Sequence, residues 1–298
     1  MNIDKEFNEF LEKMKQQEMV LNYVQIRKHG EIILDWGRMS QKTRLNTWSV
    51  SKSFVSVAVG IAMDQGMISL DEKICDSFKE YLPENPSENL LNITVKHMLT
   101  MTTGFEYSLF FADDPERYVT KDWIKYFFNQ NYPYKPGERF LYCNFNTYML
   151  ACLIEKKSGM DIMDYLNKYL FEPLGILSPD WTRCPMGHIH AANGLYLTID
   201  EFENFGQMLL QKGMYNGKRI VSEEYLNMAT KLQLPEYMET DYGFQFWINP
   251  DKESYRADGK FGQYIIVLPK QDMVVAVQSL NEGEMFDMIW NNLIAYLN

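Results

Sequence analysis

The sequence has few cationic residues and few cysteines, and it lacks long apolar runs. Its 298 residues carry 29 Lys and Arg against 40 Asp and Glu, a net charge of -11, without a basic block that could bind nucleic acid or an anionic membrane. No segment is apolar enough to span a bilayer, and the acidic start MNIDKEFNEF is unlike a signal peptide. We therefore expect a cytoplasmic protein that binds neither nucleic acid nor a membrane.

Cysteine and histidine are both scarce, with four residues of each. The cysteines form no CxxC pair and are too few for a disulfide scaffold, so we expect reduced and mostly buried thiols. The stretch CPMGHIHAANG brings Cys184, His188 and His190 close together in sequence, but it offers no obvious fourth ligand for zinc. We accordingly predict no metal and no other cofactor.

The sequence does contain enough apolar material for a sizeable core, with 46% hydrophobic and 14% aromatic residues. Its periodicity and turn residues predict helices over 3–18, from Ser49 to about Gly66, over 199–213 and over 285–297, and strands over 21–27, 31–37, 242–248, 264–269 and 273–280. Helical patterns and loops dominate from Asp71 to about Asn193. This order predicts an α+β fold, with one antiparallel sheet flanked by helices and interrupted by a helical lobe.

We expect a single domain over 1–298, because no linker, repeat or low-complexity tract is visible. Residues 1–70 and 194–298 would form the lobe that contains the sheet. Residues 71–193 would form the mainly helical lobe.

The segment WSVSKSF, residues 48–54, opens the buried helix with three serines and a lysine. Residues three apart share a helix face, which pairs Ser49 with Lys52, whereas Ser51 and Ser53 project elsewhere. An apolar helix can desolvate the lysine and lower its pKa, so that it accepts the proton of a nucleophilic serine. The alternative is a capping serine and a surface lysine, since S-x-x-K occurs often by chance. A Ser-His-Asp hydrolase of the common fold is disfavoured, because G-x-S-x-G is absent.

A second element, Tyr142-Cys143-Asn144, stands directly before a helical pattern and after the Pro136-Gly137 turn. A phenol beside a lysine can share the proton of a serine, and an amide side chain can orient both groups. Most of the 19 tyrosines must be structural, so this element has a structural alternative too.

Together and in this order, the two motifs resemble those of the serine β-lactamase and penicillin-binding-protein superfamily. The segments HMLTMTTGFEY and NGLYLTIDEFENFGQMLLQKGMYNGKRIVSEE are also similar to that family, and the resemblance extends from about residue 21 to the C-terminus. It is strongest with the class C-like branch, which includes esterases and 6-aminohexanoate-dimer hydrolases. The resemblance implies a β-lactamase/transpeptidase-like fold and an acyl-enzyme, with Ser49 as nucleophile, Lys52 as its partner, Tyr142 as general base and acid, and Asn144 as the residue that positions substrate or lysine.

The third motif of the family, usually Lys-Thr-Gly or a His variant, is replaced here by Ala257-Asp258-Gly259. In β-lactamases this lysine helps to hold the carboxylate of the drug. Its loss predicts poor activity on β-lactams, and Asp258 would repel such an anion if it faced the site.

The following stretch, GKFGQ over 259–263, matches the G-x-x-G-Q form of the esterase-like and aminohexanoate-hydrolase members. That form implies an oxyanion hole made by the backbone N–H groups of Ser49 and Lys260, with Gly259 and Gln263 lining the pocket. Gly259 would let the backbone approach the substrate, while a simple turn or bulge is an equal alternative for Gly262.

Tyr107 and Phe110 in the aromatic helical lobe, and His190 in its glycine-rich stretch, are further candidates for the pocket wall. We predict a serine hydrolase that cleaves an ester or amide bond of a small molecule through an acyl-enzyme. Alternatives are a β-lactamase, a D-amino-acid peptidase or carboxypeptidase, and a non-catalytic penicillin-binding-like protein.

Overall fold

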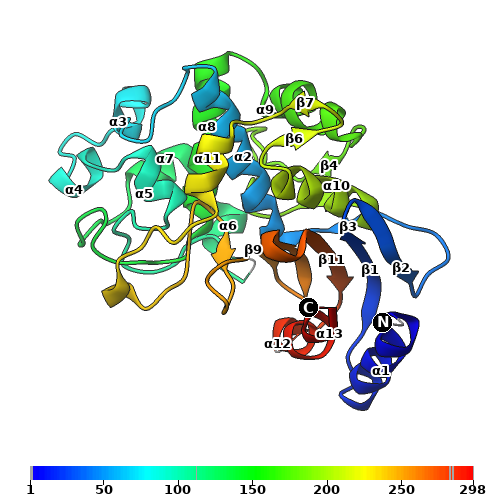
Figure 1. Ribbon diagram of the computed structural model, residues 1–298. Helices are drawn as coiled ribbons and strands as arrows, with labels where there is room; N and C mark the ends of the chain where they lie inside the picture. Colours follow the sequence, from blue (N-terminus) through cyan, green and yellow to red (C-terminus); the bar gives the residue numbers. More distant parts are fainter. Residues whose placement is uncertain (1–2, 112, 282, 284, 298) are drawn as a thin grey trace.

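The computed structural model describes residues 3–111, 113–281, 283 and 285–297. Its lower half in Figure 1 is built on a six-stranded antiparallel sheet with the order β2-β1-β11-β10-β9-β8. The strands are β1 (Leu21–Lys28), β2 (Glu31–Gly37), β8 (Trp247–Ile248), β9 (Tyr255–Gly259), β10 (Gln263–Leu268) and β11 (Met273–Ser279). The strands predicted over 21–27 and 31–37 are confirmed and pair as a β1–β2 hairpin, which turns through His29 and Gly30 at φ of 52° and 80°.

The central strands of this sheet are buried on both faces, which explains their continuous apolar sequences. Alternate residues of a strand point to opposite faces. Ile266 and Val275 therefore pack into one apolar cluster, and Ile265 and Val274 pack into another. Each face needs a helical cover, because neither carries polar side chains at these positions.

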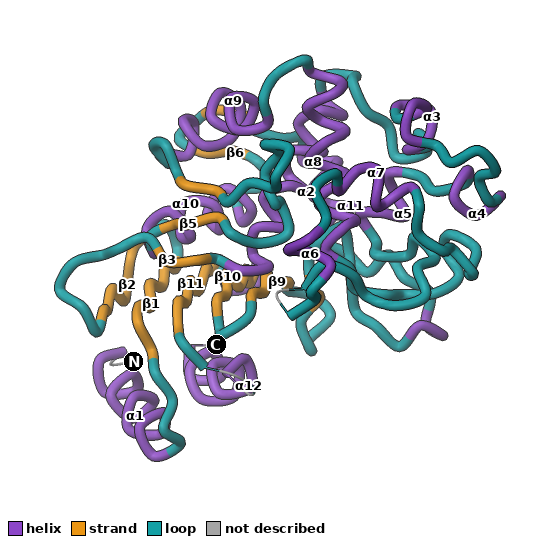
Figure 2. Tube along the Cα trace, turned by 180° about the vertical axis from the view of Figure 1, so that it is seen from behind, coloured by secondary structure: helices purple, strands orange, loops and turns teal. Residues whose placement is uncertain are grey.

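The N- and C-terminal helices cover one face, and α10 covers the other (Figures 1 and 2). The covering elements are α1 (Ile3–Gln16), α12 (Met285–Ile289), the π-helical turn η7 (Trp290–Ile294), α13 (Ala295–Leu297) and α10 (Ile199–Leu210). A capping box between Thr198 and Glu201 starts α10. A Cβ at Gly206 would lie 2.5 Å from a methyl of Val274 and 2.8 Å from one of Ile265, so this glycine lets α10 approach the sheet closely.

The upper half is mainly helical, and α2 (Ser51–Asp64) and α8 (Asn144–Ser158) pack together inside it. Residues 51–62 are all buried, as expected for the apolar run, and Gly66 follows the helix end at φ 72°. The shorter helices are α3 (Ile74–Ser77), α4 (Glu88–Leu91), α5 (Val95–Leu99), α6 (Glu116–Val119), α7 (Trp123–Phe128), α9 (Ile162–Leu166) and α11 (Glu223–Ala229). One apolar cluster joins this half to the sheet.

Short elements connect the two halves. They include the single 3₁₀ turn η1 (Trp48–Val50), the small sheet of β3 (Leu45–Asn46), β5 (Leu195–Leu197) and β4 (Asp180–Trp181), and the hairpin of β6 (Met214–Tyr215) and β7 (Lys218–Arg219). Within the described part of the chain, no helix has the length and apolar character that crossing a bilayer requires. All four cysteines are buried free thiols, as predicted.

The sequence predicts a strand over 242–248, but only β8 at its end is a strand. The hydroxyls of Ser53 and Ser56 on α2 donate to the carbonyls of Gln245 (2.7 Å) and Phe244 (2.6 Å). Gln245 has a φ of 63°, which is incompatible with a strand. Side-chain hydrogen bonds to the helix therefore replace the ladder that the β-rich composition predicts.

Candidate active site

Ser49 lies on η1, directly before α2, and Lys52 lies in the first turn of α2. The Nζ atom of Lys52 is 2.9 Å from Oγ of Ser49, and Ser49 is partly exposed to the cleft. The prediction that Ser51 and Ser53 point away is confirmed, because Ser51 donates to the carbonyl of Trp48 (2.6 Å) and Ser53 donates to the 242–248 segment. Only Ser49 combines access to the cleft with contact to the lysine among these three serines.

The ammonium or amine group of Lys52 is buried among neutral acceptors. Its side chain is 1% exposed, and Nζ contacts Oδ1 of Asn144 and the carbonyl of Ala192, both at 2.9 Å, in addition to Ser49. Burial lowers the pKa of Lys52 to about 7, because a charged amine is poorly solvated there. A neutral amine has two protons for the two carbonyl oxygens and a lone pair for the serine hydroxyl. The three contacts thus suit a lysine that acts as a base.

The Tyr142 ring lies beside this lysine, with its centroid 4.7 Å from Nζ. It stacks on Trp247 at 5.8 Å and 25°, which fixes its orientation. Burial raises the pKa of the phenol, a hydrogen bond with Ser49 lowers it in part, and the nearby charge of Asp258 raises it further. Tyr142 therefore stays protonated at neutral pH and can donate a proton.

Asn144 is the first residue of α8, and its amide bridges the lysine to the helical lobe. Oδ1 accepts from Lys52, while Nδ2 donates to the carbonyl of Phe110 at 2.8 Å. Phe110 has the left-handed φ of 62°, and its N–H donates to a carboxylate oxygen of Asp114 at 2.8 Å. The left-handed backbone at Phe110 directs its carbonyl toward Asn144. The hydrogen bond to this carbonyl orients the Asn144 amide so that Oδ1 faces Lys52.

The β9–β10 turn is pressed against η1. A Cβ at Gly259 would lie 2.4 Å from the carbonyl oxygen of Thr47 and 3.2 Å from the nitrogen of Val50. Gly259 thus permits close approach to the segment that carries Ser49, rather than to substrate as the sequence suggested. Lys260 follows it and lines the cleft next to Ser49. Gly262 adopts φ 79° in the turn, the simple alternative considered for it.

The cleft around Ser49 consists of two adjoining hollows of about 520 and 250 Å³. Their walls include three predicted residues, Tyr142, Asn144 and Lys260, and several that the sequence analysis did not select: Trp48, Phe111, Asp113, Asn193, Trp247 and Arg256. The aromatic members make much of the wall apolar. Phe111, Asp113 and Asn193 come from loops, Trp247 from β8 and Arg256 from β9, so no single short motif contains them.

Asp258 lies on the cleft wall, where the sequence analysis considered it as a possible repulsive charge. Its Oδ2 accepts from Nε of Arg256 at 2.9 Å, and Arg256 also donates to Oδ1 of Asn249 at 3.0 Å. Burial raises the pKa of Asp258, and Arg256 lowers it in part. The sequence could have indicated Arg256, because residues 256 and 258 of a strand point to the same face of the sheet.

Four expected wall residues lie elsewhere. The Phe110 ring is 1% exposed and packs on Trp123 and Phe145, whereas the neighbouring Phe111 lines the cleft. Tyr107 is 61% exposed and lies outside the two hollows. Gln263 is buried and donates to the carbonyls of Phe261 and Ser279. His190 is buried, with its ring edge-on to that of Trp123.

The sequence cluster Cys184, His188 and His190 does not converge as one set. The Sγ atom of Cys184 contacts the hydroxyl of Tyr148 at 3.4 Å, and His188 contacts Glu155. His190 is instead buried in the aromatic core, against Trp123.

Comparisons with known proteins agree with this geometry. A sequence profile of the Beta-lactamase family matches residues 7–295. The chain is 25% identical over 259 residues to the 6-aminohexanoate-dimer hydrolase of Paenarthrobacter ureafaciens, a match that covers 76% of this chain and 64% of that protein. Because the family profile matches almost the whole length, the chain belongs to the Beta-lactamase family of serine hydrolases.

Solved structures show the same fold. A Bacillus anthracis protein provisionally assigned as a 6-aminohexanoate-dimer hydrolase superposes with a TM-score of 0.82 at 19% identity, over 96% of this chain and 81% of that one. EstCE1, a hydrolase with promiscuous acyltransferase activity, superposes with a TM-score of 0.79 at 14% identity, over 99% and 98%. The predicted resemblance and the α+β β-lactamase/transpeptidase-like fold are thus confirmed.

Proposed function

We propose that the protein hydrolyses an ester or amide bond of a small molecule through an acyl-enzyme on Ser49. The observation that carries this proposal is the buried Lys52 amine, 2.9 Å from Oγ of Ser49 and with a pKa lowered to about 7. A lysine with this pKa is largely an available base at mildly alkaline pH.

In the acylation step, Oγ of Ser49 attacks the carbonyl carbon while its proton passes to Nζ of Lys52. The backbone N–H groups of Ser49 and Lys260 would stabilise the oxyanion, and one such donor contributes about 3 kcal/mol in known enzymes. The Tyr142 phenol donates its proton to the leaving oxygen or nitrogen and regains one from the Lys52 ammonium. Water then attacks the acyl-enzyme, with Lys52 accepting its proton. The bond between the acyl carbon and Oγ of Ser49 breaks, Oγ takes the proton back from Lys52, and the carboxylic acid leaves.

The aromatic part of the cleft wall supports substrates with apolar groups. The cleft is lined by Trp48, Phe111, Tyr142 and Trp247, and the larger hollow has a volume of about 520 Å³, enough for a small organic molecule. Relatives and structural neighbours include hydrolases named for a linear amide substrate and for acyl transfer, which is consistent with this class.

Poor activity on β-lactams is part of the proposal. Two cations flank the altered third motif, Arg256 and Lys260, and Arg256 already binds Asp258 and Asn249. An incoming carboxylate would have to compete with Asp258 for the guanidinium group. We expect short-chain nitrophenyl esters to be hydrolysed far faster than penicillin or a cephalosporin. Efficient cephalosporin turnover would contradict this part of the proposal and favour a β-lactamase.

The nucleophile is tested by intact-mass spectrometry after exposure to a fluorophosphonate probe. We expect one adduct on the wild type, none on Ser49→Ala, and one on the matched control Ser51→Ala. No adduct on the wild type would favour a non-catalytic binding protein, and an adduct on Ser49→Ala would show that another serine reacts.

A further inference from the structure

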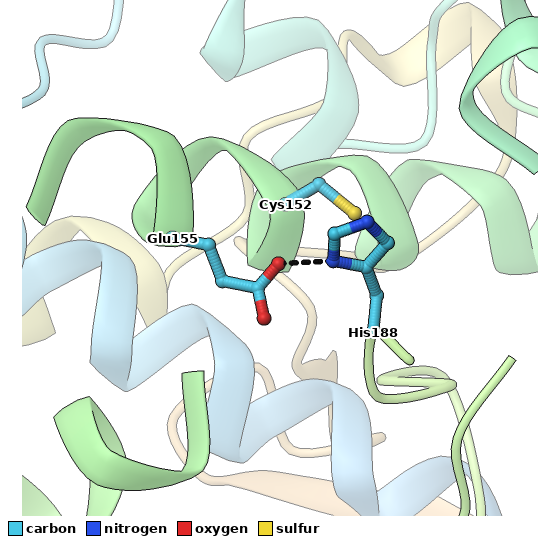
Figure 3. Close-up of side chains that lie close together, drawn as sticks. All are labelled: Cys152, Glu155 and His188. Carbon is cyan, nitrogen blue, oxygen red and sulfur yellow. Dashed lines mark hydrogen bonds and ion pairs between the residues drawn. The ribbon is translucent and has the colours of Figure 1, made fainter. Parts of the chain in front are cut away.

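A thiol, a carboxylate and an imidazole meet beside α8, outside the two hollows of the candidate active site. The proposed reaction uses none of them. Cys152 and Glu155 project from α8, and His188 projects from the loop between β4 and β5 (Figure 3). One potential ligand atom from each residue lies within 4.8 Å of those from the other two. Cys152 and Glu155 are neighbours on one face of α8, whereas His188 lies 33 residues after Glu155, so the fold brings the imidazole to them.

The group is held in place by its surroundings. The Nδ1 atom of His188 contacts Oε2 of Glu155, and Oε1 of Glu155 accepts from the backbone N–H of Ile162 at 3.2 Å. Figure 3 shows the sulfur of Cys152 beside the imidazole ring. Cys152 is 3% exposed, whereas the side chains of His188 and Glu155 are 30% and 13% exposed. One side of the group is thus closed by the core and the other is open to solvent.

We propose that Cys152, Glu155 and His188 form a binding site for a zinc-class divalent cation. Sulfur, nitrogen and carboxylate oxygen are the three ligand types that Zn²⁺ takes in proteins. With Zn–N near ~2.0 Å and Zn–S near ~2.3 Å, tetrahedral ligands lie roughly 3.3 to 3.6 Å apart, so modest side-chain rotation closes the triangle. The harder cations Mg²⁺ and Ca²⁺ prefer oxygen ligands and fit this set less well.

Charge balance favours the ion. A Cys152 thiolate and the Glu155 carboxylate together neutralise a divalent cation, which suits a half-buried position. In binding, the S–H bond of Cys152 breaks, the S–metal bond forms, and the proton leaves to solvent. The proton shared by the imidazole and the carboxylate leaves in the same way when both become ligands. Solvent enters through the open side and supplies the fourth ligand.

The position of the site suggests a structural effect. The α8 helix begins at Asn144, and the His188 loop continues to Ala192, so both segments that accept hydrogen bonds from Lys52 meet again at this group. An ion here would tie the two segments together. It would therefore raise the stability of the fold without contacting the substrate.

The test measures zinc binding to protein first treated with a chelator. Titration against a chromogenic chelator should give one equivalent of Zn²⁺ per chain, and Co²⁺ should produce a thiolate charge-transfer band. Cys152→Ala and His188→Gln should each weaken zinc binding by about tenfold or more, and Cys152→Ala should also abolish the Co²⁺ band. At zinc a hundredfold above Kd, the Tm of the wild type should rise by roughly 5 °C.

The controls are Cys75→Ala and His29→Gln, which remove a buried thiol and an exposed imidazole outside the group. Both should bind zinc like the wild type. A structural role of the Glu155–His188 pair alone would lower the Tm of His188→Gln equally with and without zinc. Absence of the Co²⁺ band in the wild type, or equal zinc binding by all variants, would overturn the proposal. Circular dichroism identifies any variant that fails to fold, and His188→Gln alters a half-buried residue with little effect on the core.

Discussion

At the scale of single residues, the chemistry depends on how one lysine is solvated. The three oxygen atoms that contact Nζ of Lys52 are neutral, and the side chain is almost fully buried. An ionic partner would hold the amine in its charged form and remove its basicity. Neutral acceptors orient the amine and leave its pKa to be set by desolvation.

The first prediction is a pH profile. The proposed reaction requires the neutral amine, and the pKa of Lys52 is lowered to about 7, so kcat/KM for an ester should be low in acid and rise with pH through about 7. Lys52→Arg, which stays charged, should lose about 10²- to 10⁴-fold in kcat/KM. Steady-state kinetics across pH checks both results. A profile that is flat from pH 6 to 8 would exclude Lys52 as the base.

The second prediction concerns Asp258. Asp258→Asn keeps a hydrogen-bond acceptor for Arg256 but removes the negative charge that competes for it. Esters with a carboxylate should gain about tenfold in kcat/KM, since a unit charge about 10 Å away at an effective dielectric of 20 contributes roughly 1.7 kcal/mol. A neutral ester serves as the control and should change little. An equal gain for both esters would mean that the substitution acts on Tyr142 instead.

The sequence could indicate the reacting residues but not the cleft wall. Helical spacing paired Ser49 with Lys52, and local order placed Asn144 at a helix start. Whether wall residues such as Phe111 and Trp247 reach the cleft depends on how a loop and an edge strand pack in the fold, which composition and periodicity do not encode. The Phe110 prediction failed by one position, because its backbone turns at φ 62° and exchanges the roles of residues 110 and 111.

At the scale of elements, close packing of backbone replaces side-chain contact at two places. The β9–β10 turn contacts η1 through Gly259, and α10 contacts the sheet through Gly206. Both contacts need a residue without a Cβ. The position of α10 matters for the site, because the helix covers the sheet face that lies next to α2.

The third prediction tests this packing. Gly206→Ala improves helix propensity by up to about 1 kcal/mol, but its methyl would meet two β-branched side chains on central strands. Overpacking of this kind costs about 1 to 3 kcal/mol, so we expect a net loss of stability in urea unfolding. Val274→Ala in the Gly206→Ala background should recover part of that loss. Simple additivity of the two changes would argue against the contact.

Most of the long elements were predictable from periodicity, and the 242–248 segment is an exception with an identifiable cause. The hairpin, α1, α2 and α10 follow from local pattern and caps. The 242–248 segment is β-rich in composition, yet Ser53 and Ser56 on α2 bind its carbonyls. Tertiary hydrogen bonds override local preference there, and a single sequence does not reveal them.

At the scale of the whole molecule, a common core links the sheet to the helical half. One apolar cluster includes Tyr23 and Ala276 of the sheet together with α2 and α8. The candidate cleft has walls from both sides of this core, since Ser49 and Asn144 lie at the starts of α2 and α8, whereas Asp258 and Lys260 come from β9 and the turn that follows it. A partial opening of either half would separate them.

The fourth prediction is that both halves unfold in one transition. The six tryptophans include Trp36 and Trp290 beside the sheet and Trp123 and Trp181 in the helical half, so fluorescence reports on both. Fluorescence, far-UV circular dichroism and loss of esterase activity should have coincident midpoints in urea. A separate early loss of activity would indicate that the halves open independently.

The contact between Gly259 and Thr47 has a consequence for how this site can change over time. It fixes the segment of Ser49 and the β9–β10 turn relative to each other, independently of the loop that holds Phe111 and Asp113. Mutation can therefore reshape the walls while the reacting centre is conserved. New substrates can be acquired by exchanging loops, and directed evolution of this protein should concentrate its diversity there.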